Sequence, residues 1–316
     1  MMKILSFLTA FLLVAQQAVS QDGKLLSQTP YTVTDSSVSQ WEKIIPDIRA
    51  LLNTVEFFSI TYLSDGLKVK GYLAVPKKEG KYPVIIYNRG GNRESSAIGD
   101  GQLIRVLGTA AGWGYVCLGS QYRGNGGGEG KEEFGGKDVN DILNLLPCLP
   151  AIEKADTSRI GMWGWSRGGM MTYLALTKTT RIKAAVVGSG MADAFIQTRK
   201  RHEMDTVFAQ LAPGYQQNRD SVLRARSAVY WADKICTTTP LLLLTGSADW
   251  RVSPEEQFEM LHRLVELNHP VRFEFFEGGQ HSLSEYYDEV NHAIKTFLDT
   301  YVRDKKQTPS LEPHGK

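Results

Sequence analysis

The chain has 316 residues, of which 42% are hydrophobic and 22% charged, and this composition excludes fibrous and intrinsically disordered proteins. The length suits one large α/β domain or two small ones. Because the formal net charge is only +2 and the basic residues are scattered, neither nucleic acid nor an anionic membrane surface is an expected partner.

The first twenty residues have the layout of a secretory signal peptide. Lys3 supplies a positive start, an apolar run follows from Ile4 to Ala15, and Ala18-Val19-Ser20 forms a small-x-small cleavage site before Gln21. The alternative, an uncleaved membrane anchor, is less favoured because the apolar run is short for a bilayer span. We therefore expect residues 1–20 to be removed and the mature protein to be secreted or periplasmic, without a membrane partner.

A helix and a hairpin are predicted before residue 80. From Ser39 to Asn53, apolar residues recur at spacings of three and four, which indicates an amphipathic helix in spite of Pro46. Two strands, 55–63 and 67–75, flank Ser64-Asp65-Gly66, and Asp-Gly is a strong signal for a tight turn between antiparallel strands.

After the hairpin, buried strands alternate with longer connections. The strands are mostly continuous apolar runs, as expected where helices cover both faces of a parallel sheet. They are predicted at 82–87, 114–118, 160–165, 183–188, 241–245 and 271–276. Helices are predicted at 138–149, 252–268 and 286–302. The expected fold class is therefore α/β, that of an α/β-hydrolase, with an eight-stranded, mostly parallel sheet.

The domain boundaries follow from this series. Residues 21–302 form one domain, and the long connection 191–234 between two of its strands is predicted to be a small helical cap on the active-site face. The segment 303–316 is polar and lacks an apolar period, so we predict a disordered tail.

Three cysteines are present, Cys117, Cys148 and Cys236, without the spacing of a metal or redox motif. At most one disulfide can form among them. Cys117 lies in an apolar run and is expected to be a small buried hydrophobe, whereas a bond between Cys148 and Cys236 stays open.

The stretch GWSRGG, residues 164–169, follows the strand predicted at 160–165 and precedes a helix. This pattern matches the G-x-S-x-G nucleophile elbow, in which glycines allow a sharp turn that presents the serine at the carboxyl end of a sheet. Ser166 is the predicted nucleophile; a plain glycine-rich turn is the alternative.

A serine hydroxyl needs a base, and the base needs an orienting acid. Asp249 follows the strand LLLLT, and His281 follows the strand FEFF, so both lie at strand ends. The order serine, aspartate, histidine is that of α/β-hydrolases. Asp193 is the rival acid. The remaining histidines have no strand end to present them: His202, His262, His269, His292 and His314.

The oxyanion hole is expected to use two backbone N–H groups. One belongs to Arg167, directly after the nucleophile, and the other to Gly90 or Gly91 in the loop YNRGGN. The alternative is a glycine-rich turn without a ligand role. A phosphate loop does not fit, because no Lys-Ser or Lys-Thr follows the glycines.

A second glycine-rich loop, QYRGNGGGEG, begins at residue 121 and matches no nucleotide-binding fingerprint. We expect it to lie near the pocket. Its Tyr122 and Arg123, together with Arg89, are the candidate substrate-binding residues. Arg123 can hold either a substrate carboxylate or a structural acid such as Asp138, and we favour the structural role.

With these residues in place, the chain from Tyr62 to Leu298 resembles the catalytic domain of the prolyl oligopeptidase family and, more loosely, the dienelactone hydrolases and acetyl xylan esterases. The similar segments are SDGLKVKGYLAVP, QYRGNGGGEG, KDVNDI, ADTSRIGMWGWSRGG, TPLLLLTGSADWRVSPEEQFEML and GGQHSL. The resemblance implies Ser166 as nucleophile, Asp249 as acid and His281 as base.

Two departures from the family pattern bear on specificity. The peptidases usually carry an N-terminal β-propeller, and about forty residues between the signal peptide and the first strand leave no room for one. The acidic pair that binds a free amino terminus in dipeptidyl peptidases belongs to that propeller. In addition, Arg89 stands where the oxyanion loop of relatives often has a tyrosine or histidine.

We therefore expect a secreted or periplasmic serine hydrolase that acts on a small molecule, a short peptide or an ester without metal or organic cofactor. A peptidase is favoured over a carboxylic or carbohydrate esterase for acetyl or feruloyl esters. A catalytically inactive binding protein on the same scaffold is the remote alternative. The oligomeric state stays open.

Overall fold

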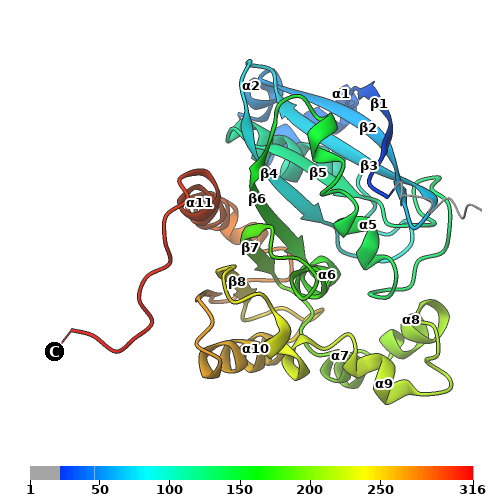
Figure 1. The fold of residues 1–316 in the computed structure, drawn as a ribbon, viewed down its shortest axis with the longest axis vertical. Coiled ribbons are helices and arrows are strands. Elements are labelled where there is room, and N and C mark those ends of the chain that lie inside the picture. The colour runs from blue at the N-terminus through cyan, green and yellow to red at the C-terminus, as the bar shows by residue number, and fades with distance from the viewer. Residues whose placement is uncertain (1–21, 46, 316) are drawn as a thin grey trace, which may run out of the picture.

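The computed structural model describes residues 22–45 and 47–315, so the predicted signal peptide and Pro46 lie outside the described residues. A nine-stranded sheet runs through the molecule in the order β1-β2-β3-β5-β4-β6-β7-β8-β9 (Figure 1). Its strands are β1 Leu25–Tyr31, β2 Val55–Ser64, β3 Leu67–Pro76, β4 Tyr82–Asn88, β5 Val116–Ser120, β6 Ala155–Trp165, β7 Ile182–Gly188, β8 Leu241–Gly246 and β9 Val271–Phe276. The predicted α/β fold is confirmed.

The first three strands are antiparallel to one another, and β3 is also antiparallel to β5. From β5 onwards, the strands β5, β4, β6, β7, β8 and β9 run parallel to one another in that order. The predicted hairpin is present: Ser64 pairs with Leu67, and Asp65 and Gly66 both have positive φ angles, +51° and +76°. Two consecutive positive φ angles match the right-handed twist of the flanking strands.

The prediction of eight strands was wrong by one. The additional strand, β1, pairs with β2 at the edge of the sheet. Its sequence LLSQTPY is mostly exposed and contains Pro30, so it has neither the apolar run nor the clear alternation by which strands are predicted.

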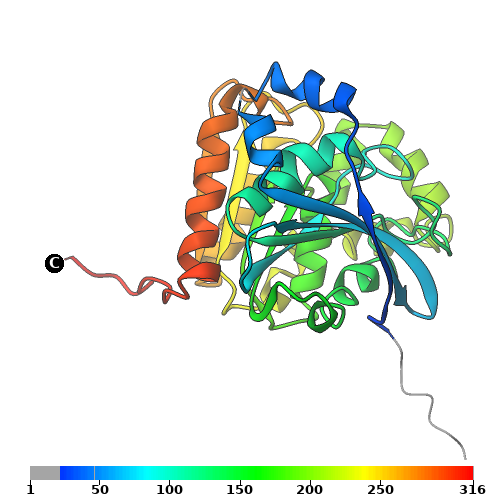
Figure 2. The ribbon, with the colours of Figure 1, turned by 90° about the horizontal axis from the view of Figure 1, so that it is seen from above.

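Helices cover both faces of the sheet (Figure 2). The face that carries Val84 and Ile86 packs against α5 Val139–Leu143, α6 Arg167–Leu176 and α10 Pro254–Glu266. The opposite face, with Ile85 and Tyr87, packs against the helical segment 100–112 and α11 Tyr287–Leu298. The segment 100–112 comprises α3 Asp100–Gln102, a π-helix Leu103–Gly108 and α4 Thr109–Gly112. Because both faces are covered, the central parallel strands β4, β5, β7 and β8 are almost entirely buried, whereas the edge strand β9 is not.

Several predicted helices differ from the observed ones in length. The helix predicted at 39–53 is replaced by α1 Asp35–Glu42 and α2 Ile48–Leu52. The helix predicted at 138–149 ends at Leu143, ahead of the prolines at 147 and 150, and a 3₁₀ turn occupies Leu149–Ala151. The last predicted helix continues after α11 as a π-helical turn, Asp299–Arg303.

The connection 191–234 contains α7 Ala194–Lys200, α8 Glu203–Leu211 and α9 Arg219–Arg224, followed by 3₁₀ turns at Ala228–Tyr230 and Ala232–Lys234. These helices lie together at one end of the molecule, beyond α6 (Figure 1). A further 3₁₀ turn, Ser284–Tyr286, precedes α11. From Asp304 to residue 315 the chain has neither helix nor strand and runs away from the body.

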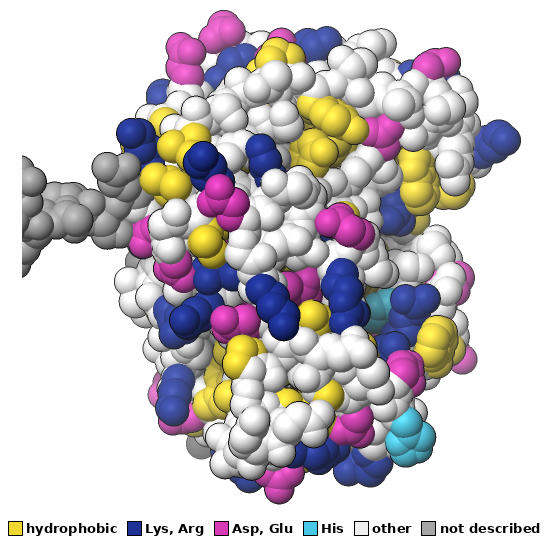
Figure 3. Space-filling view, turned by 90° about the vertical axis from the view of Figure 1, so that its right-hand side faces the viewer, with side chains coloured by type: hydrophobic (Ala, Val, Ile, Leu, Met, Phe, Trp, Pro, Cys, Tyr) yellow, Lys and Arg dark blue, Asp and Glu magenta, His cyan; other side chains and the backbone are white. Residues whose placement is uncertain are grey.

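Cys117, Cys148 and Cys236 are all free thiols, so no disulfide joins Cys148 to Cys236. Burial raises the pKa of the Cys148 thiol to about 12. Within the described residues, no helix combines the length and the apolarity that crossing a bilayer requires. On the face drawn in Figure 3, acidic and basic side chains are interspersed.

Candidate active site

Ser166 occupies a sharp turn between β6, which ends at Trp165, and α6, which begins at Arg167. Its backbone angles, φ +59° and ψ −125°, are unusual for a residue with a side chain and are of the kind that cluster at functional sites. Glycine is required around this turn. A Cβ atom at Gly164 would lie 2.1 Å from the Gly168 carbonyl oxygen, and one at Gly168 would lie 1.9 Å from the Asn88 carbonyl oxygen.

Asp249 and His281 form a hydrogen-bonded pair. Asp249 lies three residues beyond β8, and His281 lies in the loop after β9; the distance from His281 Nδ1 to Asp249 Oδ2 is 2.8 Å. The second carboxylate oxygen accepts the N–H groups of Arg251 at 2.8 Å and Val252 at 3.0 Å. The buried carboxylate is therefore held in one orientation and fixes the ring of His281.

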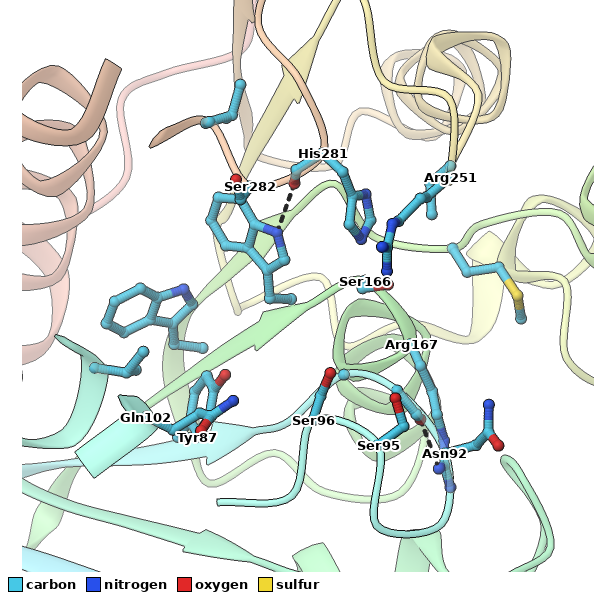
Figure 4. Close-up of a pocket in the computed structure, with 18 of the residues that line it drawn as sticks. Tyr87, Asn92, Ser95, Ser96, Gln102, Ser166, Arg167, Arg251, His281 and Ser282 are labelled. Atoms are coloured by element: carbon cyan, nitrogen blue, oxygen red, sulfur yellow. Dashed lines mark hydrogen bonds between the residues drawn. The ribbon is translucent and has the colours of Figure 1, made fainter. Parts of the chain in front are cut away.

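Ser166 and His281 line the same cavity, of about 390 Å³ (Figure 4). Among the described residues, no hydrogen bond joins the two side chains; such bonds are often long without substrate and tighten in the complex. The indole N–H of Trp165, the residue before the serine, donates to the backbone oxygen of His281 at 2.9 Å. This bond ties the loop of the histidine to the turn of the serine.

The rival acid Asp193 does not contact His281. Its carboxylate accepts the N–H of Phe195 at 2.8 Å at the start of α7 and faces the Ser227 hydroxyl at 3.4 Å. A helix N-cap accounts for this residue. Of the described histidines, only His281 lines the cavity.

Gly90 and Gly91 line the cavity beside Ser166. A Cβ atom at Gly90 would lie 3.1 Å from the Trp165 carbonyl oxygen and 3.2 Å from Ser166 Cβ, so the loop and the elbow are in close contact. Gly91 has a φ angle of +64°, and its carbonyl oxygen accepts the guanidinium of Arg167 at 3.0 Å. The two segments predicted to supply the oxyanion hole are thus adjacent.

The substrate-binding prediction for Arg89 and Tyr122 was wrong, because neither side chain lines the cavity. The buried guanidinium of Arg89 donates to the backbone oxygens of Gln121, at 2.8 and 3.1 Å, and Gly90, at 3.1 Å. The Tyr122 hydroxyl donates to the Arg89 carbonyl oxygen at 3.0 Å. Both residues hold the two glycine-rich loops together.

Arg123 has the structural role that the sequence favoured, but with different partners. It binds Asp141 at 2.7 Å and Asp65 at 2.8 Å, not Asp138. Arg123 is also absent from the lining of the cavity.

Asp138 instead binds Arg167, at 2.6 Å, and Glu132 completes this buried triad through a charge-assisted hydrogen bond to the same guanidinium. The Arg167 guanidinium lies over the rings of Tyr122 and Phe134, with centroid distances of 4.7 and 4.5 Å. This arrangement was not predicted from the sequence. Its signal in the sequence was the acidic residues inside the segments GGGEGKEEF and KDVNDI, and no motif pairs them with Arg167.

Much of the lining of the cavity is apolar. Its apolar and aromatic lining residues include Tyr87, Phe134, Trp163, Trp165, Met191 and Met204. Four arginines line the cavity, at 105, 167, 201 and 251, and none of the described aspartates or glutamates does so. Arg251 has no acidic partner among the described residues, and Figure 4 shows it near His281.

Glu256 anchors the start of the helical connection 191–234. It lies buried in the first turn of α10 and accepts the N–H groups of Ala192 and Asp193, both at 3.1 Å, and the amide of Gln197 at 2.7 Å. Gln197 lines the cavity, so this carboxyl group positions one wall of the site. Burial raises the pKa of Glu256 to about 8.

We expect the free energy of unfolding to fall as the pH rises through neutrality because of Glu256. The folded protein retains a proton on this carboxyl group up to about pH 8, whereas the unfolded chain releases it near the ordinary value of 4.5. The extra proton stabilises the fold fully below pH 4.5, and this stabilisation is lost as the pH rises to about 8, by up to about 1.4 kcal/mol per pH unit.

Glu256→Gln should flatten this pH dependence, measured by urea unfolding at pH 5, 6.5 and 8. Glu255→Gln is the matched control, since the neighbouring Glu255 is half exposed and bonds to Arg199 and Lys200 at the surface. Equal slopes for wild type and Glu256→Gln would contradict the assignment.

Comparison with known proteins places these features in a family. Residues 104–305 match the model of the prolyl oligopeptidase family. The chain is 30% identical over 228 residues to the uncharacterized peptidase YtmA of Bacillus subtilis, covering 72% of this chain and 86% of the relative.

Solved structures share the fold. The acylaminoacyl peptidase of Pyrococcus horikoshii superposes with a TM-score of 0.68 at 24% identity over 88% of this chain, which spans less than half, 45%, of that peptidase. The Pyrococcus furiosus esterase Pf2001 superposes with a TM-score of 0.61 at 21% identity, covering 80% of this chain and 95% of the esterase chain.

Proposed function

The chain belongs to the prolyl oligopeptidase family of serine hydrolases, and we propose that it cleaves small peptides or esters through an acyl-enzyme formed on Ser166. One observation carries the proposal: the 2.8 Å bond between His281 and Asp249 orients an imidazole into the cavity that Ser166 also lines. This combination is what activation of a serine hydroxyl requires.

In the proposed reaction, Ser166 Oγ attacks the carbonyl carbon of the substrate, and His281 Nε2 accepts the hydroxyl proton. Asp249 stabilises the resulting imidazolium through the proton on Nδ1. The tetrahedral intermediate then collapses, and His281 returns the proton to the departing amine or alcohol. Water, activated by the same imidazole, hydrolyses the ester on Ser166 and regenerates the hydroxyl group.

We assign the stabilisation of the tetrahedral oxygen anion to the backbone N–H groups of Arg167 and of Gly90 or Gly91. The N–H of Arg167 lies at the start of α6. There, the backbone N–H groups without a partner inside the helix and the helix dipole both favour a bound negative charge. The contact of Gly90 with the elbow supports its participation. The Arg167 side chain, bound to the Gly91 carbonyl oxygen, fixes the relative position of the two segments.

Gly90→Ala is expected to lower kcat/KM by roughly tenfold to a hundredfold, because the new methyl group displaces the loop from the elbow by a few tenths of an ångström. Gly99→Ala, where no atom lies within 4 Å of the position that the methyl group would take, is the matched control and should leave turnover unchanged. Steady-state kinetics on any turned-over ester test this expectation. Equal activities of the two variants would remove Gly90 from the oxyanion hole.

We favour a peptidase for substrates without a free amino terminus close to the cleaved bond. The family and the relative YtmA support peptide cleavage. Because none of the aspartates and glutamates in the described ranges lines the cavity, a substrate ammonium group would find no counter-charge there. Anionic groups would face Arg105 and Arg251, whereas the other two lining arginines, Arg167 and Arg201, already bind carboxylates. Esters are the second candidate, supported by the match along 95% of the Pf2001 esterase chain.

A matched substrate series separates these candidates. We expect N-acylated peptide anilides to be cleaved faster than the same peptides with a free amino terminus. Turnover of acetyl or feruloyl esters, with none of any anilide, would assign the protein as an esterase. Silence on all substrates, together with an unreactive Ser166, would favour the inactive binding protein.

We also propose that the protein is exported, on the strength of the sequence pattern in residues 1–20 alone. Mass spectrometry of the protein from its native host tests this point. A mature chain that begins at Gln21 is expected, and an intact chain beginning at Met1 in the cytoplasmic fraction would contradict it.

A further inference from the structure

The two edges of the sheet differ in how they are protected against pairing with another strand. At one edge, β1 carries Pro30, which has no N–H group, and its register with β2 is irregular between Leu25 and Ser27. Both features are typical protections of an edge strand. At the other edge, β9 is paired to β8 in unbroken register from Val271 to Phe276 and has neither feature.

The backbone of β9 presents alternate residues to its free edge. The N–H of Leu241 in β8 donates to the carbonyl oxygen of Pro270, so residues 270, 272, 274 and 276 direct their N–H and C=O groups towards β8. Residues 271, 273 and 275 therefore direct theirs outwards. No other strand within the described residues pairs with this edge.

The side chains of β9 are sorted between the two faces of the strand. Arg272 and Glu274 lie on the face towards α11, where they form an ion pair at 2.9 Å at the molecular surface. Phe273 and Phe275 lie on the opposite face and pack at a tilt against Phe258 of α10, with centroid distances of 5.7 and 5.2 Å.

The aromatic cluster is poorly covered. Phe258 and Phe275 are 46% and 47% exposed, which is high for adjacent large apolar side chains. The free edge is thus bordered by an apolar strip on one face and by a charge pair of opposite signs on the other.

We propose that β9 pairs antiparallel with β9 of a second copy of this chain, about a two-fold axis at Phe273. In this register Phe273 faces its own symmetry mate, and Val271 faces Phe275. In both pairs the two residues exchange N–H···O=C hydrogen bonds. This agrees with the backbone of β9, because the N–H and C=O groups of residues 271, 273 and 275 point towards the free edge. Arg272 then lies opposite Glu274 of the second copy, in the closer, non-hydrogen-bonded type of pair.

The charges select this register over the others. A two-fold axis at Arg272 would oppose two arginines, and an axis at Glu274 would oppose two glutamates, both of which are unfavourable. An axis at Val271 or Phe275 leaves both charged residues without an opposite charge across the interface. Only the axis at Phe273 forms two cross-strand ion pairs, and it brings the aromatic clusters of the two copies together. The resulting interface is self-complementary, as two-fold symmetry demands.

Cysteine cross-linking tests the register. Phe273→Cys should form a disulfide-linked dimer on mild oxidation, because the two Cα atoms at the axis would be about 5.5 Å apart, within the range of a disulfide. Phe275→Cys is the matched control, since its two copies would be separated by four residues along the strands, roughly 13 Å. Cross-linking of both variants to the same extent, or of neither, would overturn the proposed pairing.

Charge reversal tests the partner. The wild type should be a dimer by sedimentation, and Arg272→Glu or Glu274→Arg alone should weaken dimerisation at least tenfold. One single variant carries two negative charges at positions 272 and 274, and the other carries two positive charges there, so mixing the two variants should restore a dimer. The variant that carries both changes should dimerise by itself, because opposite charges again face each other across its interface. A monomeric wild type, or dimers indifferent to these changes, would contradict the proposal. Neither result depends on the proposed catalytic activity.

Discussion

Ser166→Ala is expected to lower kcat by about four to six orders of magnitude, while the free energy of unfolding stays within about 1 kcal/mol of the wild type. The substitution removes the atom that forms the acyl bond, and nothing else in the cavity replaces it. The side chain makes no hydrogen bond to His281 in the described structure, so its loss leaves no partner unpaired. The strained backbone of the elbow is the same for alanine and serine.

Kinetics and urea unfolding on the same preparations separate catalysis from folding. Ser95→Ala, which changes an exposed hydroxyl lining the same cavity, is the control and should retain nearly full activity. Turnover by Ser166→Ala within tenfold of the wild type would exclude the serine as nucleophile. A loss of activity that follows a loss of folding would show a structural role only.

Arg167→Met should destabilise the fold by about 3–5 kcal/mol, which is the typical cost of removing one member of a buried ionic group. The guanidinium is the counter-charge of Glu132 and Asp138, and all three side chains are almost fully buried. Without it, two carboxylates remain close together in a low-dielectric environment. The change also releases the bond to Gly91, so activity should fall in the molecules that still fold.

The triple variant Arg167→Met, Glu132→Gln, Asp138→Asn serves as the control for buried charge. It removes the two carboxylate charges together with the cation and should recover a large part of the lost stability, as replacement of whole buried ionic groups often does. Urea unfolding at constant pH measures both variants. If the single and triple variants are equally unstable, the loss comes from packing and not from unpaired charge.

The positions of Ser166, Asp249 and His281 could be predicted because each depends on local sequence. Ser166 and Asp249 follow strands that end in buried, apolar residues, His281 follows the edge strand β9, and the carboxyl ends of parallel strands meet at one edge of the sheet. The glycines at 164 and 168 are similarly local, because the chain approaches other backbone there too closely for a side chain. Strand ends and turn residues thus locate a site without knowledge of the packing around it.

The directions of side chains in the loops could not be predicted in the same way. Arg89, Tyr122 and Arg123 lie in glycine-rich segments near the cavity, but their orientation depends on partners distant in sequence, such as Asp141 for Arg123 and the Gln121 carbonyl oxygen for Arg89. The triad of Arg167 likewise joins residues 29 and 35 positions apart. A motif gives a residue's place on the backbone, and tertiary contacts decide where its side chain points.

The remaining differences between the predicted and the observed helices and strands arise from the limits of hydrophobic periodicity as a predictor. The polar edge strand β1 buries little, so its sequence is under little pressure to alternate. Apolar residues at helical spacing in 39–53 and 138–149 pack against the body in short helices and turns, because burial alone does not require a continuous helix. Hydrophobic pattern predicts what is buried more reliably than it predicts the bounds of an element.

Covalent labelling with a fluorophosphonate, followed by mass spectrometry of the digested protein, measures the activation of Ser166 directly. The probe forms a stable phosphonate ester only with a serine hydroxyl that a neighbouring base activates. We predict one adduct, on Ser166, formed in the wild type and abolished in His281→Ala, while Ser95→Ala labels like the wild type. An unlabelled Ser166 in folded protein, or labelling unaffected by the loss of His281, would contradict the proposed serine-histidine-aspartate mechanism.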